Sequence, residues 1–313
     1  MGVNNVFRGG HVLSLCQYQR SDLEMLFARA DELAAMDRLC LNSRLTGRIM
    51  VTAFYQRSTR TRLAHESAIA RLGGQTIGFV DPEITRAADF ARESLDDVAR
   101  MLVGYGDVLV LRHGERGVPA RVAAWSAIPV INAGDGAGEH PTQAMVDLYT
   151  MRLRFGRLDG LRVLLMGDMR MRTANSLLLG LSLFDCQVSF VAPPEMQPHP
   201  DVLAYLAGVG VTPVRAPRTR DVLSEVDVLY VQPVVQPDTV TTPQAPPPTP
   251  PDYLVDLRLL RTYGHDRLLV LHPLPRHDEL CQDVDDTEHN GYWTAATNGV
   301  LVRMALLDLM LGD

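Results

Sequence analysis

Lysine is absent from this chain of 313 residues, so arginine supplies all 30 basic side chains. A guanidinium stays protonated at neutral pH, which excludes a lysine Schiff base or a neutral lysine acting as a base. The 37 acidic residues outnumber the basic ones and give a formal net charge of −7. This balance argues against a general affinity for nucleic acid or for anionic membranes.

Cysteine is scarce, and its spacing carries no motif. The chain has four cysteines, far apart and without a Cys-x-x-Cys pair. We therefore expect neither a disulfide framework nor a cysteine zinc site, and predict that the thiols are free and buried. Walker and dinucleotide glycine motifs, His-Glu-x-x-His and Gly-x-Ser-x-Gly are also missing. No metal and no cofactor are expected.

Long hydrophobic runs are missing too. The longest candidates, such as residues 177–184, have the size of a core segment and not of a membrane span. The first residues contain no basic segment followed by an apolar stretch. We expect a cytoplasmic protein that does not interact with a membrane.

Short runs rich in Val, Ile and Leu alternate with segments of helical period. One set of strand-like runs covers 48–55, 75–80, 107–112 and 128–132, and a second covers 161–167, 187–192, 211–215, 227–232 and 267–272. Helices are predicted over 21–36, 58–72, 94–104, 142–154 and 294–311. The alternation predicts an α/β fold of two doubly wound parallel-sheet domains, residues 1–148 with 293–313 and residues 149–292.

Local signals refine this prediction. Ser21 and Glu24 form a candidate capping box for the first helix, and Gly73-Gly74 is expected to end the helix over 58–72. The last helix places Val300, Met304, Leu307 and Leu311 on one face. Residues 237–253 contain seven prolines and are expected to form an extended loop, either functional or disordered. The acidic pairs Asp96-Asp97 and Asp285-Asp286 are expected on solvated faces.

Ser58-Thr59-Arg60-Thr61 stands directly after a predicted strand, where a helix begins. Helix amino termini bind anions, and three hydroxyls with a guanidinium in the same turn suit a phosphate. The alternative is that Ser58 or Thr59 merely caps the helix and Arg60 is exposed. Taken alone, the cap is the commoner case.

Three further segments lie at predicted strand ends. Arg112 closes an apolar strand, and ligands bind beyond the carboxyl ends of parallel strands. His140 and Gln143 stand in the first turn of a helix, after a glycine-rich turn. In the run from His272 to Arg276, two prolines leave backbone carbonyls available to a ligand. Each segment also has a purely structural alternative. Arg112 could simply face solvent, the turn with His140 and Gln143 could be a simple helix cap, and the run from His272 to Arg276 could be a rigid turn.

The order and spacing of these motifs resemble the transcarbamoylases, and within them the aspartate carbamoyltransferase catalytic chains. The matching stretches are 54–66, 130–150 and 271–279, and the likeness runs over nearly the whole chain. The resemblance implies a carbamoyl-phosphate domain, an amino-acid domain and a terminal helix that crosses back to the first. It also implies a homotrimer with active sites at subunit borders, whose ligands are carbamoyl phosphate and an amino-acid acceptor.

The resemblance also implies roles for individual residues. The phosphate would be held by Ser58, Thr59, Arg60 and Thr61. Arg112 would bridge the phosphate and the carbonyl oxygen, and His140 would polarise that carbonyl. Gln143 and the Leu274 carbonyl would hold the carbamoyl NH2 group. Arg172, in the loop after 161–167, would bind the acceptor α-carboxylate, with Gln232, Pro273 and Leu274 beside it. Preorganised donors would then stabilise the oxyanion as a neutral amine attacks and phosphate leaves.

The sequence departs from the family pattern on the acceptor side. The loop that carries a lysine in the family reads Arg86 to Ser94 here, so Arg92 or Arg86 is the candidate substitute. Gln56 stands where the family has a glutamate, and Gln232-Pro233-Val234-Val235-Gln236 stands where it has an arginine and a glutamine that bind the side-chain carboxylate of aspartate. Three functions stay open: carbamoylation of an amine other than aspartate, which these departures favour, aspartate carbamoylation, and a catalytically silent trimeric scaffold or ligand-binding partner.

Overall fold

The computed structural model describes residues 5–80, 93–234 and 248–312, and the chain divides into two compact units. Unit 1 comprises residues 1–146 and 296–313, and unit 2 comprises residues 147–295. The boundaries expected from the sequence, after 148 and before 293, lie close to these.

Unit 1 contains a four-stranded parallel sheet in the order β2-β1-β3-β4. Its strands are β1 (Ile49–Phe54), β2 (Gln75–Phe79), β3 (Val108–His113) and β4 (Val130–Asp135). Because β2 and β3 flank β1, the direction of winding changes between β1 and β3. Ligands of doubly wound sheets bind at the strand carboxyl ends near such a point.

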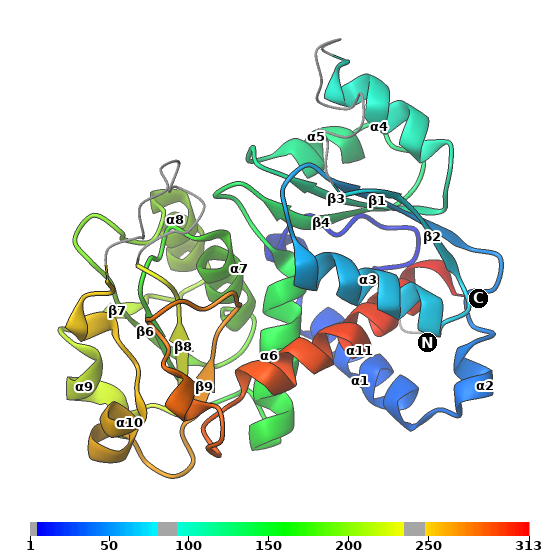
Figure 1. The fold of residues 1–313 in the computed structure, drawn as a ribbon. Coiled ribbons are helices and arrows are strands. Elements are labelled where there is room, and N and C mark those ends of the chain that lie inside the picture. The colour runs from blue at the N-terminus through cyan, green and yellow to red at the C-terminus, as the bar shows by residue number, and fades with distance from the viewer. Residues whose placement is uncertain (1–4, 81–92, 235–247, 313) are drawn as a thin grey trace. The chain divides into compact units, whose positions relative to one another are not determined.

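Helices cover both faces of this sheet. They are α1 (Arg20–Ala35), α2 (Arg38–Leu41), α3 (Thr59–Arg71), α4 (Leu95–Val103), α5 (Val118–Ala123) and the last part of α11 (Tyr292–Leu311). Figure 1 shows α4 and α5 on one face and α3 with α1 and α11 on the other. Val98 and Val122 of α4 and α5 pack with Val51 and Leu109 of the sheet in one buried cluster. The helix α6 (Pro141–Phe155) begins in unit 1 and continues into unit 2.

Two helix-end predictions have different outcomes. Gly73 follows α3 with φ +84°, and a Cβ there would stand 1.9 Å from the Asn42 carbonyl oxygen, so the predicted glycine stop is confirmed. The predicted capping box of Ser21 and Glu24 is wrong. The helix starts earlier, Ser21 lies inside it, and the Gln19 N–H donates to the Asp22 carboxylate at 2.7 Å.

Unit 2 contains a five-stranded parallel sheet in the order β7-β6-β5-β8-β9. Its strands are β5 (Arg162–Met166), β6 (Gln187–Val191), β7 (Val214–Arg215), β8 (Val228–Val231) and β9 (Leu269–Leu271). Its helices are α7 (Arg172–Leu181), α8 (Pro200–Gly208), α9 (Thr219–Val222) and α10 (Leu257–Tyr263). Winding changes direction between β5 and β8. Two parallel-sheet α/β units are thus the fold that the sequence predicts.

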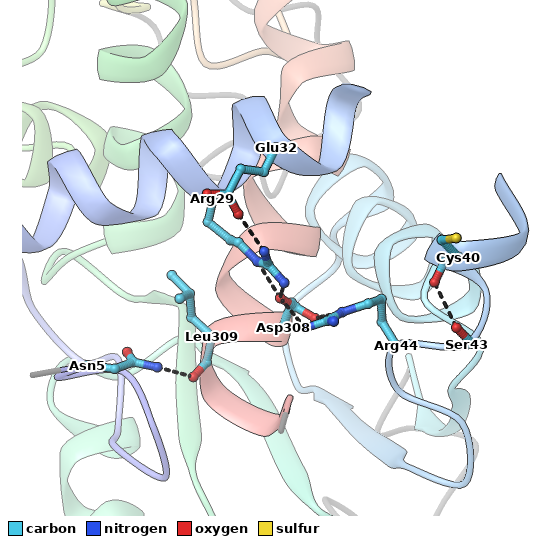
Figure 2. A network of polar contacts seen from close by, with 8 residues as sticks. All are labelled: Asn5, Arg29, Glu32, Cys40, Ser43, Arg44, Asp308 and Leu309. Carbon is cyan, nitrogen blue, oxygen red and sulfur yellow. Dashed lines mark hydrogen bonds and ion pairs between the residues drawn. The ribbon is translucent and has the colours of Figure 1, made fainter. Parts of the chain in front are cut away.

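The C-terminal helix α11 is more deeply buried than its pattern suggests. The helix is docked as expected, but Val302, Ala305 and Leu306 are buried along with Met304 and Leu307, so its burial extends beyond the face that the sequence pattern marks. The helix is long and apolar enough to cross a membrane, but 56% of that window is buried inside the protein, as in a core helix. Arg29 and Arg44 hold its Asp308 at 2.6 and 2.8 Å, and Asn5 donates to the Leu309 carbonyl (Figure 2).

Three other expectations need correction. None of the four cysteines forms a disulfide, but none is buried, and Cys16 and Cys40 are exposed. Most of the proline-rich segment lies outside the described residues, and its end, Pro251–Tyr253, forms a 3₁₀ turn instead of an extended chain. Asp285 is only partly exposed and not a free solvated acid, because Arg276 binds both of its carboxylate oxygens at 2.5 and 2.6 Å.

Candidate active site

The first turn of α3 presents the Ser-Thr-Arg-Thr motif at the carboxyl end of β1. Ser58 occupies the N-cap position, but its side chain makes no capping hydrogen bond. The simple-cap alternative therefore fails for Ser58. Thr59 and Arg60 are exposed, and local desolvation lowers the pKa of Arg60, which stays cationic at neutral pH. The helix terminus and this cation together suit a phosphate.

Thr61 points from this turn to the histidine of another motif. Its hydroxyl lies 3.1 Å from His140 Nε2, and both side chains are buried. His140 directly precedes α6, after β4, so the contact joins the ends of two strands in one sheet. The hydroxyl of Thr142 lies 3.5 Å from the other ring nitrogen of His140. The structure thus brings two of the predicted site segments together.

The turn before His140 has a tightly determined backbone. Asp135 accepts hydrogen bonds from the backbone N–H groups of Gly117 and Glu139, each at 2.7 Å. Gly136 has φ +49°, and a Cβ there would stand 2.5 Å from the Gly114 carbonyl oxygen. This turn fixes where α6 begins and so where His140 is placed.

Arg112 and Gln143 complete the predicted set on unit 1. Arg112 is the next-to-last residue of β3, pairs with Phe54 of β1 and donates through Nη1 to the Ala133 carbonyl at 3.1 Å. It is partly buried, so it is not an arginine that simply extends into solvent. The Gln143 N–H donates to the His140 carbonyl at 3.0 Å, in the first turn of α6. All these residues lie at the carboxyl ends of β1, β3 and β4.

A histidine that the sequence analysis did not select lies behind Thr61. His65 is fully buried in α3, and its Nδ1 lies 2.8 Å from the Thr61 carbonyl oxygen, to which it donates. Burial and the positive charge of Arg303 lower the pKa of His65 well below 6.5. Its other ring nitrogen, Nε2, has no hydrogen-bond partner among the described residues. This neutral histidine supports the backbone of the predicted phosphate turn.

Unit 2 carries the predicted acceptor residues at the ends of β5 and β8. Arg172 is the first residue of α7 and not a loop residue. Its neighbour Arg170 is held by both carboxylate oxygens of Asp168, each at 2.9 Å. Gln232 is fully buried, and its amide nitrogen donates to the Thr173 hydroxyl at 2.8 Å. Gln232 therefore anchors the start of α7, beside Arg172.

The segment after β9 contains Pro273 and Leu274. Leu274 has φ +55°, a conformation that a leucine adopts rarely. Its N–H donates to His272 Nδ1 at 2.8 Å, and His272 Nε2 lies 2.8 Å from Glu279. Neither Glu279 nor the Arg276–Asp285 ion pair was selected from the sequence. Glu279 could have been identified from its spacing, because it follows His272 by only seven residues.

Some predicted positions lie beyond the described part of the chain. Arg86 and Arg92, the candidate substitutes for the family lysine, belong to residues 81–92, which the structure does not describe. Gln56 is described and partly buried. Among the described residues, no group of three His, Cys, Asp or Glu side chains is placed to hold a metal ion.

Comparisons with known proteins identify the family to which both units of the chain belong. Residues 10–153 match the family model "Aspartate/ornithine carbamoyltransferase, carbamoyl-P binding domain", and residues 159–310 match "Aspartate/ornithine carbamoyltransferase, Asp/Orn binding domain". The aspartate carbamoyltransferase catalytic subunit of Methanopyrus kandleri is 39% identical over 98% of both chains. That of Thermofilum pendens is 42% identical over 98% of this chain and 96% of its own.

Solved structures give the same result. Aspartate transcarbamoylase from Trypanosoma cruzi, in complex with carbamoyl aspartate and phosphate, superposes with a TM-score of 0.87 at 32% identity. The superposition covers 98% of this chain and 97% of that one. The complex of the same enzyme with carbamoyl phosphate has a TM-score of 0.85, covering 98% and 97%.

Proposed function

Because this chain belongs to the aspartate/ornithine carbamoyltransferase family, we propose that it transfers the carbamoyl group of carbamoyl phosphate to the amino group of an amino acid. The observation that carries the proposal is the contact between Thr61 and His140. The first turn of α3, which we propose binds the phosphate, therefore lies next to the imidazole that would polarise the carbonyl. Arg60 and Arg112 then supply positive charge where negative charge develops during transfer.

The reaction needs no covalent intermediate on the protein. The acceptor's neutral amine attacks the carbonyl carbon, and a tetrahedral oxyanion forms. His140 and Arg112 stabilise that oxyanion as preorganised donors. The C–O bond to phosphate then breaks, phosphate leaves with the bridging oxygen, and it takes up the proton released by the amine. Holding both reactants in this geometry supplies much of the remaining acceleration.

We infer that the acceptor is an amino acid held by its α-carboxylate at Arg172 and that it differs from aspartate. A second carboxylate would need its own cation, yet no basic residue occurs from Gln232 to Leu257. The arginines after β5 and β9 do not supply this cation, because Arg170 and Arg276 are each bound to a carboxylate of the protein. Losing a hydrogen-bonded ion pair to a carboxylate costs about 2–5 kcal/mol of binding free energy.

Aspartate itself is the second candidate acceptor, because the relatives and solved structures reported above are named for it. The full chain should be incubated with carbamoyl phosphate and a panel of amino acids that includes aspartate, with ureido products detected colorimetrically. We expect another amino acid to give the highest kcat/KM. Aspartate as the best acceptor would refute the acceptor inference and leave the transferase proposal intact.

The transferase proposal has its own test. Phosphate should stabilise the wild-type chain against heat, by about 2.7 kcal/mol at a hundred times its dissociation constant. Arg60→Ala should abolish this stabilisation, whereas Arg62→Ala should retain it, because Arg62 pairs with Glu66 on the same helix at 3.5 Å. No stabilisation of the wild type, together with no ureido product from any amino acid, would favour the silent scaffold.

A further inference from the structure

The segment from His272 to Glu279 contains a buried acid–imidazole pair. The Leu274 N–H can only donate, so His272 Nδ1, at 2.8 Å, accepts and carries no proton. The proton of the neutral ring therefore resides on Nε2, which donates to Glu279 Oε1 at 2.8 Å. The contacts of the ring thus define its tautomer.

Glu279 is held as a carboxylate, although only one of its two oxygens is hydrogen-bonded within the described part of the chain. The residue is 1% exposed, and its Oε1 also accepts from the His277 N–H at 2.9 Å. Burial by itself would raise the pKa of Glu279, but the bonds from His272 and His277 lower it below its ordinary value. Its second oxygen, Oε2, is buried without a hydrogen-bond partner among the described residues. A buried, half-satisfied carboxylate costs stability, which points to a role other than stability.

The residue that this pair holds is strained. Leu274 is the one non-glycine residue with positive φ in the described part of the chain. Such a conformation costs about 1–2 kcal/mol for a residue with a β-carbon and persists only when its surroundings impose it. At the far side of the segment, Asp285 holds Arg276 through both carboxylate oxygens. The backbone of Leu274 is therefore fixed from two directions.

We propose that Glu279, acting through His272, is a positioning residue that holds Leu274 in its left-handed conformation, so that the Leu274 carbonyl is preset to accept a hydrogen bond from the carbamoyl NH2 group. The proposal rests on the proposed transferase function. His272 and Glu279 do not touch the reacting atoms themselves; they determine the direction of a backbone acceptor.

Two variants separate positioning from general stability. Glu279→Gln keeps an oxygen that can accept from His272, whereas Glu279→Leu removes both the acceptor and the unpartnered oxygen. We expect Glu279→Leu to lower kcat about tenfold, the effect of one hydrogen bond lost in the transition state. The dissociation constant of inorganic phosphate should stay within about twofold, since phosphate is bound on unit 1. Glu279→Gln should keep most of the activity.

The 15N shifts of labelled histidine give a readout that does not depend on turnover. The His272 signals can be assigned by their loss in His272→Gln. In the wild type we expect protonation at Nε2 alone, and in Glu279→Leu a mixture of tautomers together with faster hydrogen exchange at the Leu274 amide. Protonation of wild-type His272 at Nδ1 or at both nitrogens would overturn the proposal, as would unchanged kcat and exchange in Glu279→Leu. If the wild type transferred no carbamoyl group to any amino acid, the proposed function would fail, while the tautomer and exchange would still decide whether Glu279 fixes Leu274.

Discussion

The Thr61 hydroxyl lies 3.1 Å from His140 Nε2 and joins two segments that are 79 residues apart in the chain. Each segment follows a strand of the same sheet, and β3, which carries Arg112 as its next-to-last residue, lies between those two strands. Parallel strands bring their carboxyl ends to one edge, so the sheet order itself assembles these groups. The contact also gives His140 a defined direction before any ligand binds.

Replacing His140 by alanine tests its role at the carbonyl. Loss of one preorganised donor to a developing oxyanion lowers kcat by about 10²- to 10³-fold. Stabilisation by inorganic phosphate should persist in His140→Ala, because the α3 turn holds the phosphate. Thermal shifts and initial rates measured on the same preparation check both expectations. An equal loss of phosphate binding would mean that His140 contacts the phosphate and not the carbonyl.

The sequence predicts the framework well because strands and helices have distinct hydrophobic periods. All nine predicted strand runs overlap a strand, although 211–215 shortens to Val214–Arg215, an edge strand with few partners. Helix starts were less predictable. The start of α1 depends on the Gln19–Asp22 cap, and Gln19 is not among the common capping residues.

Site residues next to strand ends were predictable, whereas residues that support them were not. Ser58 and His140 each follow a strand, Arg112 lies next to the last residue of one, and topology alone assigns them to one edge. His65 and Glu279 act through contacts made in the folded chain, and their sequence neighbours give no such pattern. From the sequence alone, a histidine inside a helix such as His65 cannot be distinguished from an ordinary surface residue. Only the structure shows that it is fully buried.

His65 should make stability depend on pH below about 6.5. Its pKa in the folded chain lies well below the ordinary 6.5, because of burial and of Arg303, so the unfolded chain binds more protons in that range. The free energy of unfolding should therefore fall as the pH drops, by at most about 1.4 kcal/mol per pH unit for one proton. Urea titrations of the wild type and His65→Leu from pH 8 to pH 5 measure this. An identical pH dependence in the two proteins would show that His65 is not the group responsible.

Asp308 should stabilise unit 1 by fastening the terminal helix. Its side chain is 2% exposed and binds Arg29 and Arg44 (Figure 2). Removing the charge in Asp308→Asn leaves two arginines without their carboxylate and should lower the free energy of unfolding by about 3 kcal/mol. Glu32→Gln is the matched control, because Glu32 binds the same Arg29 but is 59% exposed, and should cost about 0.5 kcal/mol or less. Similar losses in the two variants, measured by chemical denaturation, would contradict a specific role for Asp308.

Asp285 and Asp286 are adjacent in the chain, yet their replacement should have very different effects. Asp285 binds Arg276 through two oxygens and also accepts from the Tyr292 hydroxyl, whereas Asp286 is exposed. Charge-assisted hydrogen bonds of this kind contribute about 1.5–3 kcal/mol each, so Asp285→Asn should destabilise unit 2 by about 2 kcal/mol. Asp286→Asn should change stability by less than about 0.5 kcal/mol.

The same pair predicts a local effect on the segment that carries Leu274. The Arg276 hydrogen bonds lower the pKa of Asp285, so its contribution to stability is complete above its ordinary value of 3.8 and is lost as the pH falls through the lower folded value. At neutral pH the ion pair is intact, and Asp285→Asn should then increase hydrogen exchange over residues 273–279 while leaving exchange in β9 unchanged. Equal exchange in Asp285→Asn and Asp286→Asn would show that Arg276 does not hold this segment.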